Sequence, residues 1–302
     1  MNIVTLTLNP ATDVHCTGAH FAAGKENFAE ITLRQSGGKG VNISRALTEN
    51  GVENTAFLLL GEENGGEFQK GLDGALCRVA ALSVPGRIRE NITVHTPEGE
   101  TRLSFPGFSV QPDILPRIEK ELEQADVLTL TGSLPAGMTA EDWKPILRRA
   151  TERGVKTVID SRSFSLADLR EIKPWLIKPN RQEISGYLGR EVETFEEVIP
   201  EAKRLHEDGI ENVMVSLGES GALLVCGEGV FLAQPPQVAV CSTIGAGDSS
   251  IAGFLTGSTA ADRLRRAVAF GTAACLTEGT LPPRRDDVAE ILKKVTVSRL
   301  SL

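Results

Sequence analysis

The sequence predicts an α/β protein built on a mostly parallel central sheet with helices on both faces. Short apolar runs of strand length alternate along the chain with segments whose apolar residues recur every three or four positions. That alternation is typical of repeated βαβ units. At 302 residues the chain has room for one large domain or two ordinary ones. We expect a single domain over 1-302, because no linker rich in Pro, Gly and Ser divides it.

The elements follow one another in regular order from the N-terminus. The apolar runs that predict strands lie at 3-8, 55-60, 127-130, 155-159 and 213-217. The periodic segments that predict helices include 115-122, 143-150 and 198-205. Gly51 and Gly154 follow helical segments, where glycine adopts the left-handed conformation that ends many helices.

Two segments interrupt this order, at about 12-36 and 87-110, and both favour strands without helices. The first contains an alternating run at 28-33. The second predicts a hairpin, with strands at 91-95 and 100-105 joined through Pro97, Glu98 and Gly99. Two such insertions at one edge of an α/β domain can pair into a small separate sheet. We expect that sheet to be a lid over a site or a dimerisation surface.

Charge and composition argue against several classes of protein. Forty acidic and thirty-two basic side chains give a net charge of -8, which suits neither nucleic acid nor an anionic membrane as the main partner. No run reaches the roughly 18 apolar residues of a membrane span, and the first residues do not resemble a secretion signal. The five cysteines form no CxxC pair, and the four histidines lack metal-ligand spacing. We expect a cytoplasmic protein without a transition-metal site.

The strongest chemical signal is the glycine-rich segment 241-254, which runs from a turn into a helix. Gly245 and Gly247 let the backbone approach an anion, and the first N–H groups of the helix point outward with the positive end of its dipole. Asp248 follows at once. A carboxylate beside an anion hole suits phosphoryl transfer to an alcohol, where it accepts the proton of the attacking hydroxyl. The alternative is an Asp that only caps the helix.

A second glycine cluster, 36-42, precedes the helix that ends near Gly51. Three glycines around Lys39 allow main chain and ammonium to converge on a polar ligand, and Asn42 adds an amide from the first helical turn. The segment is not a P-loop, because Lys39 is followed by Gly40 rather than Ser or Thr. It is not a dinucleotide fingerprint either, because no GxGxxG follows the first strand. Taken alone, a glycine-rich loop and a binding site explain it equally well.

Two further segments lie at the ends of expected strands, where ligands bind in open parallel sheets. Lys178 follows the apolar run 175-177, and Asn180 and Glu183 are spaced so that both can offer oxygen to hydrated magnesium. The alternative for this pair is a capping box, in which Asn180 caps a helix and Glu183 bonds back to it. The segment 216-218 is a glycine turn after another strand.

In their order and separation, these segments resemble the PfkB-type branch of the ribokinase-like carbohydrate kinases. The likeness runs from Leu8 to the helix after Asp248. The matching segments are LNPATD at 8-13, GGKGVN at 37-42, GSLPAG at 132-137, WLIKPNRQE at 175-183, SLGESGAL at 216-223 and STIGAGDS at 242-249. The resemblance implies a ribokinase-like fold, with 12-36 and 87-110 as its β-sheet lid, which often also builds a dimer.

The resemblance also implies roles for the residues of the glycine-rich turn and the strand ends. Asp248 would be the catalytic base, and the anion hole for the transferring phosphoryl group would consist of Gly245, Ala246 and Gly247. The positions that match the nucleotide-phosphate contacts of the family are Lys178, Ser216 and Gly218. Asn180 and Glu183 would organise Mg²⁺, directly or through water.

On the sugar side the resemblance implies a site for a phosphorylated substrate. The residues that match it are Asp13, Gly38, Lys39, Asn42, Arg89 and Ser133. The spacing around Arg89 departs from the pattern of the family, so Arg87 and Arg89 can exchange roles. Ser242, Thr243 and Ile244 replace the Asp-Thr-Thr of the wider superfamily, which favours a phosphosugar and leaves a monovalent-cation site open.

Within the family, the likeness is to the 1-phosphofructokinases first and to the tagatose-6-phosphate kinases next. It implies transfer of a phosphoryl group from ATP to a ketohexose phosphate, with D-fructose 1-phosphate and its 6-hydroxyl as the first expectation. Tagatose 6-phosphate and other sugars are the alternatives within the class. A non-catalytic sugar-phosphate sensor on the same fold is the alternative of a different class, and a homodimer through the lid is a further expectation.

Overall fold

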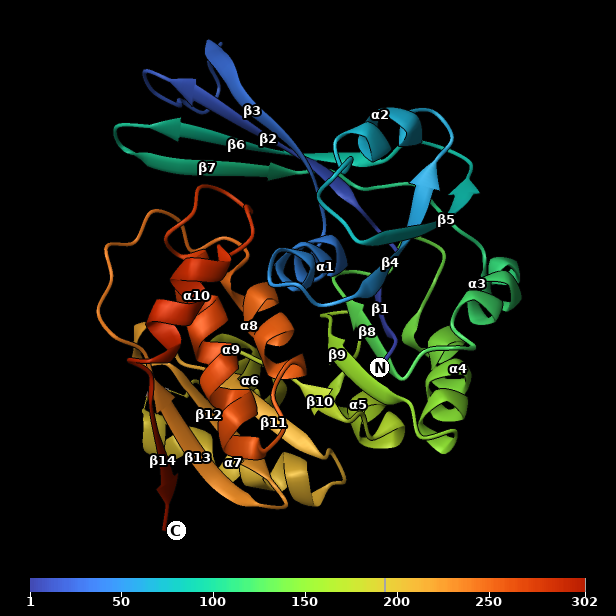
Figure 1. Cartoon of the computed structure of the whole chain (residues 1–302). Helices are drawn as coiled ribbons and strands as arrows, with labels where there is room; N and C mark the ends of the chain where they lie inside the picture. Colours follow the sequence, from blue (N-terminus) through green and yellow to red (C-terminus); the bar gives the residue numbers. More distant parts are fainter. Residues whose placement is uncertain (193, 302) are drawn as a thin grey trace.

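The computed structural model, which describes residues 1–192 and 194–301, has a ten-stranded sheet between two layers of helices (Figure 1). The sheet is parallel from β5 to β11 and antiparallel from there to its far edge. In spatial order its strands are β14 (Thr296–Leu300), β13 (Gly229–Gln234), β12 (Ala222–Cys226), β11 (Asn212–Ser216), β10 (Leu176–Ile177), β9 (Lys156–Asp160), β8 (Val127–Thr131), β1 (Ile3–Thr7), β4 (Asn54–Gly61) and β5 (Arg78–Val84).

Each face of the sheet is covered by its own set of helices and has its own hydrophobic core. One face packs against α1 (Lys39–Glu49), α8 (Ala246–Leu255), α9 (Ala260–Ala274) and α10 (Arg285–Leu292). The other packs against α2 (Gly65–Lys70), α3 (Leu115–Glu121), α4 (Ala140–Glu152), α5 (Leu166–Ile172), α6 (Arg181–Leu188) and α7 (Phe195–Glu207). Two short 3₁₀ turns lie at Pro112–Ile114 and Gly218–Ser220.

The α/β class predicted from hydrophobic periodicity is confirmed, and the expected strands lie within one residue of the observed ones at most ends. Gly51 and Gly154 have φ of 76° and 80°, so both take the left-handed conformation expected after a helix. The antiparallel edge β12–β14 was not expected. Its strands are short apolar runs like the parallel ones, and only the tight connection at Gly227 and Glu228 distinguishes a hairpin there.

A second sheet of four strands stands apart from the first, in the order β3-β2-β6-β7 (Figure 1). Its strands are β2 (Ala11–Gly18), β3 (Ala29–Gly37), β6 (Arg89–Thr96) and β7 (Gly99–Ser104). They come from the two segments that the sequence marked as β without helices. A register shift between His15 and Cys16 interrupts the pairing of β2 with β3.

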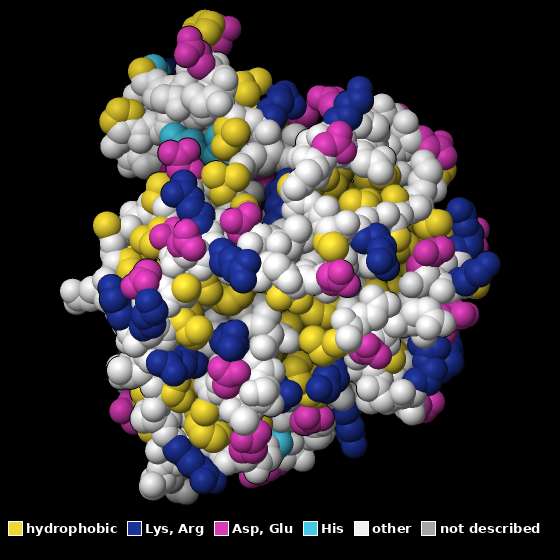
Figure 2. Space-filling view, viewed as in Figure 1, with side chains coloured by type: hydrophobic (Ala, Val, Ile, Leu, Met, Phe, Trp, Pro, Cys, Tyr) yellow, Lys and Arg dark blue, Asp and Glu magenta, His cyan; other side chains and the backbone are white. Residues whose placement is uncertain are grey.

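The two faces of this second sheet differ in chemistry. Val14, Cys16 and Val94 form a small core on one face, and Ile31 and Leu103 extend that face because they lie opposite Cys16 and Ile92. On the other face stand polar side chains, among them Asp13, His15, Asn91 and Arg102. Figure 2 shows the sheet as a projecting lobe with hydrophobic side chains exposed among charged ones.

Two further observations concern membrane-spanning helices and the state of the cysteines. Across residues 1–192 and 194–301, the structure contains no helix with both the length and the apolar character needed to cross a membrane. The five cysteines are free thiols.

Candidate active site

Asp248 lies in the first turn of α8, at the carboxyl edge of the parallel sheet. The N-cap of this helix is Gly245, whose φ of 79° needs a residue without a side chain. Asp248 is therefore the third residue of the helix, and the interpretation of Asp248 as the helix cap is wrong. Its carboxylate is buried and accepts a hydrogen bond of 2.8 Å from Nδ2 of Asn42, on α1. The two glycine-rich segments of the sequence thus meet through this bond.

Burial raises the pKa of Asp248 to about 6. Lys39, the Asn42 hydrogen bond and Lys178 act in the opposite direction, and the neighbouring carboxylate of Asp160 adds to the rise. A carboxylate with a pKa near 6 is ionised at neutral pH and still has appreciable affinity for a proton. Asp248 therefore has the properties of a general base that works close to neutral pH.

Asp160, at the end of β9, joins the two lysines of the site. Its Oδ2 lies 2.8 Å from Nζ of Lys39 and 3.9 Å from Nζ of Lys178. Burial alone would raise the pKa of Asp160, but Lys178 and Lys39 outweigh it and the pKa is lowered. Asp160 is thus a permanent anion that fixes both ammonium groups. The sequence alone did not single out Asp160. Its position directly after the apolar run 155-159 nevertheless indicates the end of a strand, where ligands bind in such sheets.

Lys178 lies against the glycine-rich turn. A side-chain carbon placed on Gly247 would lie 3.2 Å from the Nζ of Lys178, so glycine at this position leaves room for the ammonium group. The first N–H groups of α8 and this buried ammonium therefore converge at one place. Such a convergence of helix dipole, backbone donors and positive charge favours a phosphate group.

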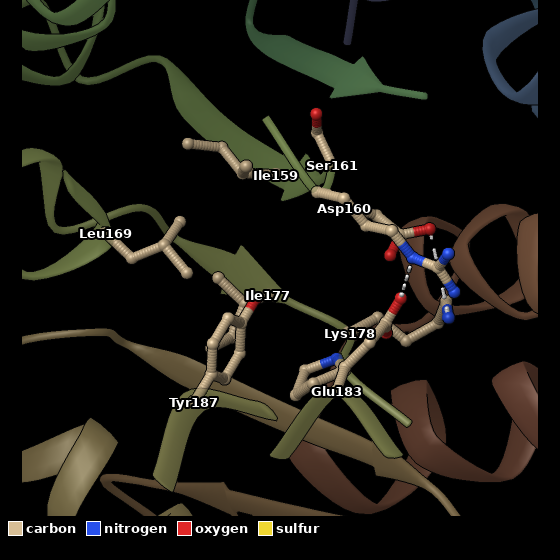
Figure 3. Close-up of a pocket in the computed structure, with 10 residues that line it drawn as sticks. Ile159, Asp160, Ser161, Leu169, Ile177, Lys178, Glu183 and Tyr187 are labelled. Carbon is tan, nitrogen blue, oxygen red and sulfur yellow. Dashed lines mark hydrogen bonds and ion pairs between the residues drawn. The ribbon is translucent and has the colours of Figure 1, made fainter. Parts of the chain in front are cut away.

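Lys178 and Asn180 lie between β10 and α6, and Glu183 lies in the first turn of α6. Lys178 and Glu183 line a small pocket (Figure 3). Asn180 caps α6: its Oδ1 accepts from the backbone N–H of Glu183 at 2.8 Å, and Glu183 Oε2 accepts from the backbone N–H of Asn180 at 3.0 Å. The capping box considered from the sequence is therefore present. It fixes the Glu183 carboxylate at the pocket that Asp160 also lines, as Figure 3 shows.

Ser216 and Gly218 lie beside this segment. Ser216 ends β11 and forms an isolated bridge with Asn180, and its backbone N–H donates to Pro179 O at 3.0 Å. Gly218 has φ of 62°, in the left-handed region. The carboxyl ends of β9, β10 and β11 thus place Asp160, Lys178 and Ser216 along one edge of the sheet.

On the other side of the site, Asp13 projects from β2 of the second sheet. Its Oδ1 accepts from Nδ2 of Asn91 at 2.9 Å, and its Oδ2 lies 2.7 Å from where a side-chain carbon on Gly37 would stand. Gly37 therefore allows the carboxylate to contact the backbone before α1. Gly38 has φ of 130°, and Asn42 N–H donates to its carbonyl at 2.9 Å.

Arg89 and Arg87 occupy different surroundings, which separates two alternatives of the sequence. Arg89 is half-buried, and Asp13 is the charge that most opposes the effect of its burial. Arg87 instead lines a hollow at the base of the second sheet, together with Arg34 and Glu90. Arg89 thus lies close enough to Asp13 for the carboxylate to act on its guanidinium group.

Ser133 and Lys39 complete this side. Ser133 Oγ accepts from Nδ2 of Asn9 at 3.0 Å, which ties the GSLP turn to the end of β1. Gly132 has φ of 79°, and a side-chain carbon there would lie 3.9 Å from Cβ of Lys39. The structure therefore brings the residues expected on the sugar side around the N-terminus of α1, although Lys39 is already paired with Asp160.

Comparison with known proteins identifies relatives over most of the chain. The profile of the pfkB family carbohydrate kinases matches residues 19–280. The 1-phosphofructokinase of Haemophilus influenzae is 33% identical over 283 residues, which cover 90% of this chain and 89% of that protein. The 1-phosphofructokinase of Bacillus subtilis is 30% identical over 307 residues, covering 99% and 100%.

Solved structures agree with these relatives. Phosphofructokinase-2 from Escherichia coli, in complex with substrates and products, superimposes with a TM-score of 0.89 at 29% identity, covering 97% of this chain and 99% of that one. A possible 1-phosphofructokinase from Thermotoga maritima gives a TM-score of 0.85 at 25% identity, with both chains fully covered. Similar structures of the Escherichia coli enzyme include a complex with potassium and a tetrameric inhibited form. These matches confirm the ribokinase-like fold expected from the motifs.

Proposed function

The chain belongs to the pfkB family of carbohydrate kinases, and from its site we propose that it transfers the γ-phosphoryl group of ATP to the 6-hydroxyl of D-fructose 1-phosphate. The products are ADP and fructose 1,6-bisphosphate. The observation that carries the proposal is the buried carboxylate of Asp248 at the N-terminus of α8. The 1-phosphofructokinase relatives, at 30–34% identity over most of the chain, support the substrate.

In this reaction Asp248 accepts the proton of the 6-hydroxyl as the oxygen attacks the γ-phosphorus. The new bond joins O6 to phosphorus, and the bond between the γ-phosphorus and the bridging oxygen breaks, leaving ADP. Asn42 holds the carboxylate in place, because its Nδ2 donates to Oδ2 and leaves Oδ1 for the substrate. A base that stands ionised at neutral pH can take this proton directly.

The anion hole of Gly245, Ala246 and Gly247 stabilises the charge on the transferring group, with Lys178 beside it. Little covalent chemistry remains for the protein in phosphoryl transfer, so positioning and charge stabilisation dominate. Lys178, Ser216 and Gly218 form the nucleotide side of the site, along the carboxyl ends of β10 and β11.

Magnesium fits the donors at this edge. Glu183 and Asp160 line one pocket, and Mg²⁺ in phosphoryl-transfer sites keeps several waters and takes few protein carboxylates. Asn180 and Glu183 would hold it through water, because their capping bonds already use Asn180 Oδ1 and Glu183 Oε2. When bound, the ion neutralises charge on the phosphates of ATP.

On the sugar side, Asp13 accepts hydrogen bonds from substrate hydroxyls, with Gly38, Lys39, Asn42 and Ser133 around them. Arg89 provides positive charge for the phosphate. The second sheet, including 12-36 and 87-110, acts as a lid that excludes water from the phosphoryl group. It contacts the loop between α9 and α10, where Thr280 Oγ1 donates to Gln35 Oε1 at 3.2 Å.

The lid also provides a surface for a homodimer. Ile31 and Leu103 on the sheet, and Phe28 and Phe105 directly beside β3 and β7, are 41–80% exposed, which is unusual for large apolar side chains gathered in one small region. Burial of these side chains against a second copy would remove them from water, and sedimentation equilibrium tests this assembly. The five free thiols suit a reducing cytoplasm.

The test of the proposed function is a panel of acceptors with Mg-ATP, in which ADP and the phosphorylated sugar are both measured. We expect the largest kcat/KM with fructose 1-phosphate, and smaller values with tagatose 6-phosphate, fructose 6-phosphate, fructose and a nucleoside. Preference for a neutral sugar would remove the roles assigned to Lys39 and Arg89. No turnover with any acceptor, despite binding of ATP and a sugar phosphate, would indicate a sensor.

A further inference from the structure

Two of the free thiols, those of Cys241 and Cys275, lie beside the glycine-rich turn of the active site. Cys241 directly precedes the turn at 242–245, which leads into α8, and Cys275 is the C-cap of α9. The backbone N–H of Cys241 donates to the carbonyl oxygen of Cys275 at 2.8 Å. The fold thus makes direct neighbours of two cysteines that are far apart in the sequence.

This backbone hydrogen bond limits the distance between the two residues. With standard bond lengths, an N···O distance of 2.8 Å places the two Cα atoms at most about 6.7 Å apart. Disulfides join residues whose Cα atoms are usually about 4.4 to 6.8 Å apart. Cys275 Sγ donates only a weak bond, 3.4 Å to Gly271 O, so its side chain loses little when it turns to another rotamer. The pair can therefore form a disulfide without a large movement of the backbone.

Cys275 lies on the face of α9 that packs against α8 (Figure 1). A side-chain carbon on Gly271 would lie 3.2 Å from Ala246 O, so α9 meets the first turn of α8 there. Cys275 is one helical turn further along the same face, level with the turn that precedes α8. Ser242 N–H also donates to Cys275 O, at 3.3 Å, and Ser242 Oγ donates to Gly279 O at 3.4 Å. The turn before the proposed anion hole is thus tied to the end of α9.

The two thiols differ in how easily they react. Cys241 is exposed, whereas Cys275 is half-buried, and burial raises the pKa of the Cys275 thiol. Because the thiolate is the nucleophile in disulfide exchange, the exposed Cys241 reacts first with a small oxidant and Cys275 reacts second. Cys16 and Cys226 are buried, and Cys77 is exposed but lies next to β5, an edge strand of the main sheet. Cys77 therefore provides a control thiol away from the turn.

We propose that Cys241 and Cys275 form a reversible disulfide under oxidising conditions, and that this bond switches the kinase off by displacing the 242–247 segment. The Cys241 thiolate attacks one sulfur of a low-molecular-weight disulfide, whose S–S bond breaks and releases one thiol. Cys275, after losing its proton, attacks the sulfur of Cys241, and the second thiol leaves. The protein loses two electrons, and the small disulfide is reduced to two thiols that take up the two protons.

The loss of activity follows from where the new bond pulls. A sulfur–sulfur bond draws the Cys241 side chain from solvent toward α9, and the residues after it carry the backbone N–H groups of Gly245, Ala246 and Gly247. Donors in an anion hole act only when they are held in place, so their displacement lowers the rate. Disulfides that form transiently in a reducing compartment are typical of redox sensing. This inference goes beyond the proposed function, because it applies whichever sugar is the acceptor.

The experiment treats the reduced protein with glutathione disulfide and measures two quantities. Mass spectrometry of peptides identifies the sulfur links, and kcat is measured with the best acceptor of the panel. For the wild type we expect the loss of two hydrogens, a link between Cys241 and Cys275, and a fall in kcat of about 10²-fold, as for the loss of one anion-hole donor. Dithiothreitol should restore kcat. Cys77→Ser is the matched control and should behave as the wild type.

Two variants separate the steps of the exchange. Cys275→Ser lacks the second thiol, so it should keep one glutathione on Cys241. Cys241→Ser lacks the first, so it should form no link and keep its kcat throughout the treatment. Circular dichroism and the Tm under reducing conditions show that each variant is folded.

Three results would overturn the inference. A stable glutathione adduct on Cys241 of the wild type, or no reaction of either thiol, would show that the pair does not close. A complete disulfide with unchanged kcat would show that it is not a switch. An equal loss of kcat in Cys241→Ser would assign the effect to another thiol. The sulfur links are measured without an acceptor, so they decide the pairing even if fructose 1-phosphate is not the substrate.

Discussion

Asp248 and Asp13 lie at the two ends of the site, and their surroundings differ. Asp248 is buried at the start of a helix and receives one amide hydrogen bond, and burial raises its pKa to about 6. Asp13 stands on a strand of the lid, receives the Asn91 amide, and lies among arginines. On the proposed function, the carboxylate of Asp248 is thus suited to proton transfer and that of Asp13 to substrate binding. Local charge and burial, not residue type, decide the role.

The difference also concerns how firmly each carboxylate is supported. Asp248 lies on α8 and is hydrogen-bonded to Asn42 on α1, and these two helices pack against each other and on the main sheet. Asp13 belongs to a four-stranded sheet with a small core of its own. A group that must meet a reacting hydroxyl gains from rigid support, whereas a group that closes over a substrate gains from mobility.

The largest contrast comes from replacing each aspartate by asparagine. We expect Asp248→Asn to lower kcat about 10²- to 10⁴-fold, since the amide cannot accept the proton. Asp13→Asn should mainly raise the KM for the sugar phosphate. For each variant, kcat and the KM for the sugar phosphate are measured from ADP release at saturating ATP, and ATP binding is checked by calorimetry. Similar effects of the two variants on kcat would show that the aspartates do not differ in role.

The same Asp248→Asn variant should be more stable than the wild type. A carboxyl whose pKa rises from 3.8 to about 6 on folding costs about 3 kcal/mol when it is ionised, and the amide removes that cost. The wild type should accordingly gain stability as the pH falls from above 6 toward 4 at this group, and the variant should lack that gain. Urea unfolding at pH 7.5 and at pH 5 measures both. Equal stability of the two proteins at pH 7.5 would contradict the raised pKa.

Adding a methyl group at Gly247, in the proposed anion hole, tests the Asp248 end of the site without changing the charge of any residue. In Gly247→Ala the new carbon would lie 3.2 Å from Nζ of Lys178, so the ammonium group must shift by a few tenths of an ångström beside the transferring group. We expect kcat to fall about 10²- to 10³-fold, as for the loss of one donor to the transition state. Gly186→Ala is the matched control, because that helical glycine has no atom within 4 Å of the new carbon. Equal activities of the two variants would place Lys178 outside the reaction.

The smallest effect expected is on the pH profile. Because Asp248 must be ionised, kcat should fall about tenfold for each pH unit below about 6. The sugar phosphate is kept saturating, since its own phosphate titrates near pH 6. The residual rate of Asp248→Asn should lack this inflection. A wild-type kcat that is flat from pH 7 to pH 5 would assign the base elsewhere.

Much of this architecture could be predicted from the sequence, because it depends on local patterns. Alternating apolar runs and helical periods indicated the parallel sheet, and glycine-rich turns marked the strand ends where the site lies. The two β segments without helices indicated the second sheet. The family resemblance then implied roles that periodicity and glycine turns cannot assign, such as those of Asp13 and Arg89.

What could not be predicted depends on contacts between distant parts of the chain. Asp160 becomes part of the site only because the order of β9 and β10 in the sheet brings it between Lys39 and Lys178. Arg102 is one of many charged residues until the pairing of β6 with β7 places it on the face of Asn91. The choice between Arg87 and Arg89 likewise depends on where the fold places their two side chains.

The alternation of polar and apolar side chains along β2 has a consequence for how the gene can vary. Side chains alternate between the faces of a strand, so adding or removing one residue in β2 would turn Asp13 toward the apolar face and Val14 toward the substrate. Substitutions on the apolar face leave that alternation intact. Length changes should therefore occur in the connection at 19–28, which joins β2 to β3, or at the bulge where β3 already holds one extra residue, Thr32, while β2 keeps a constant number of codons.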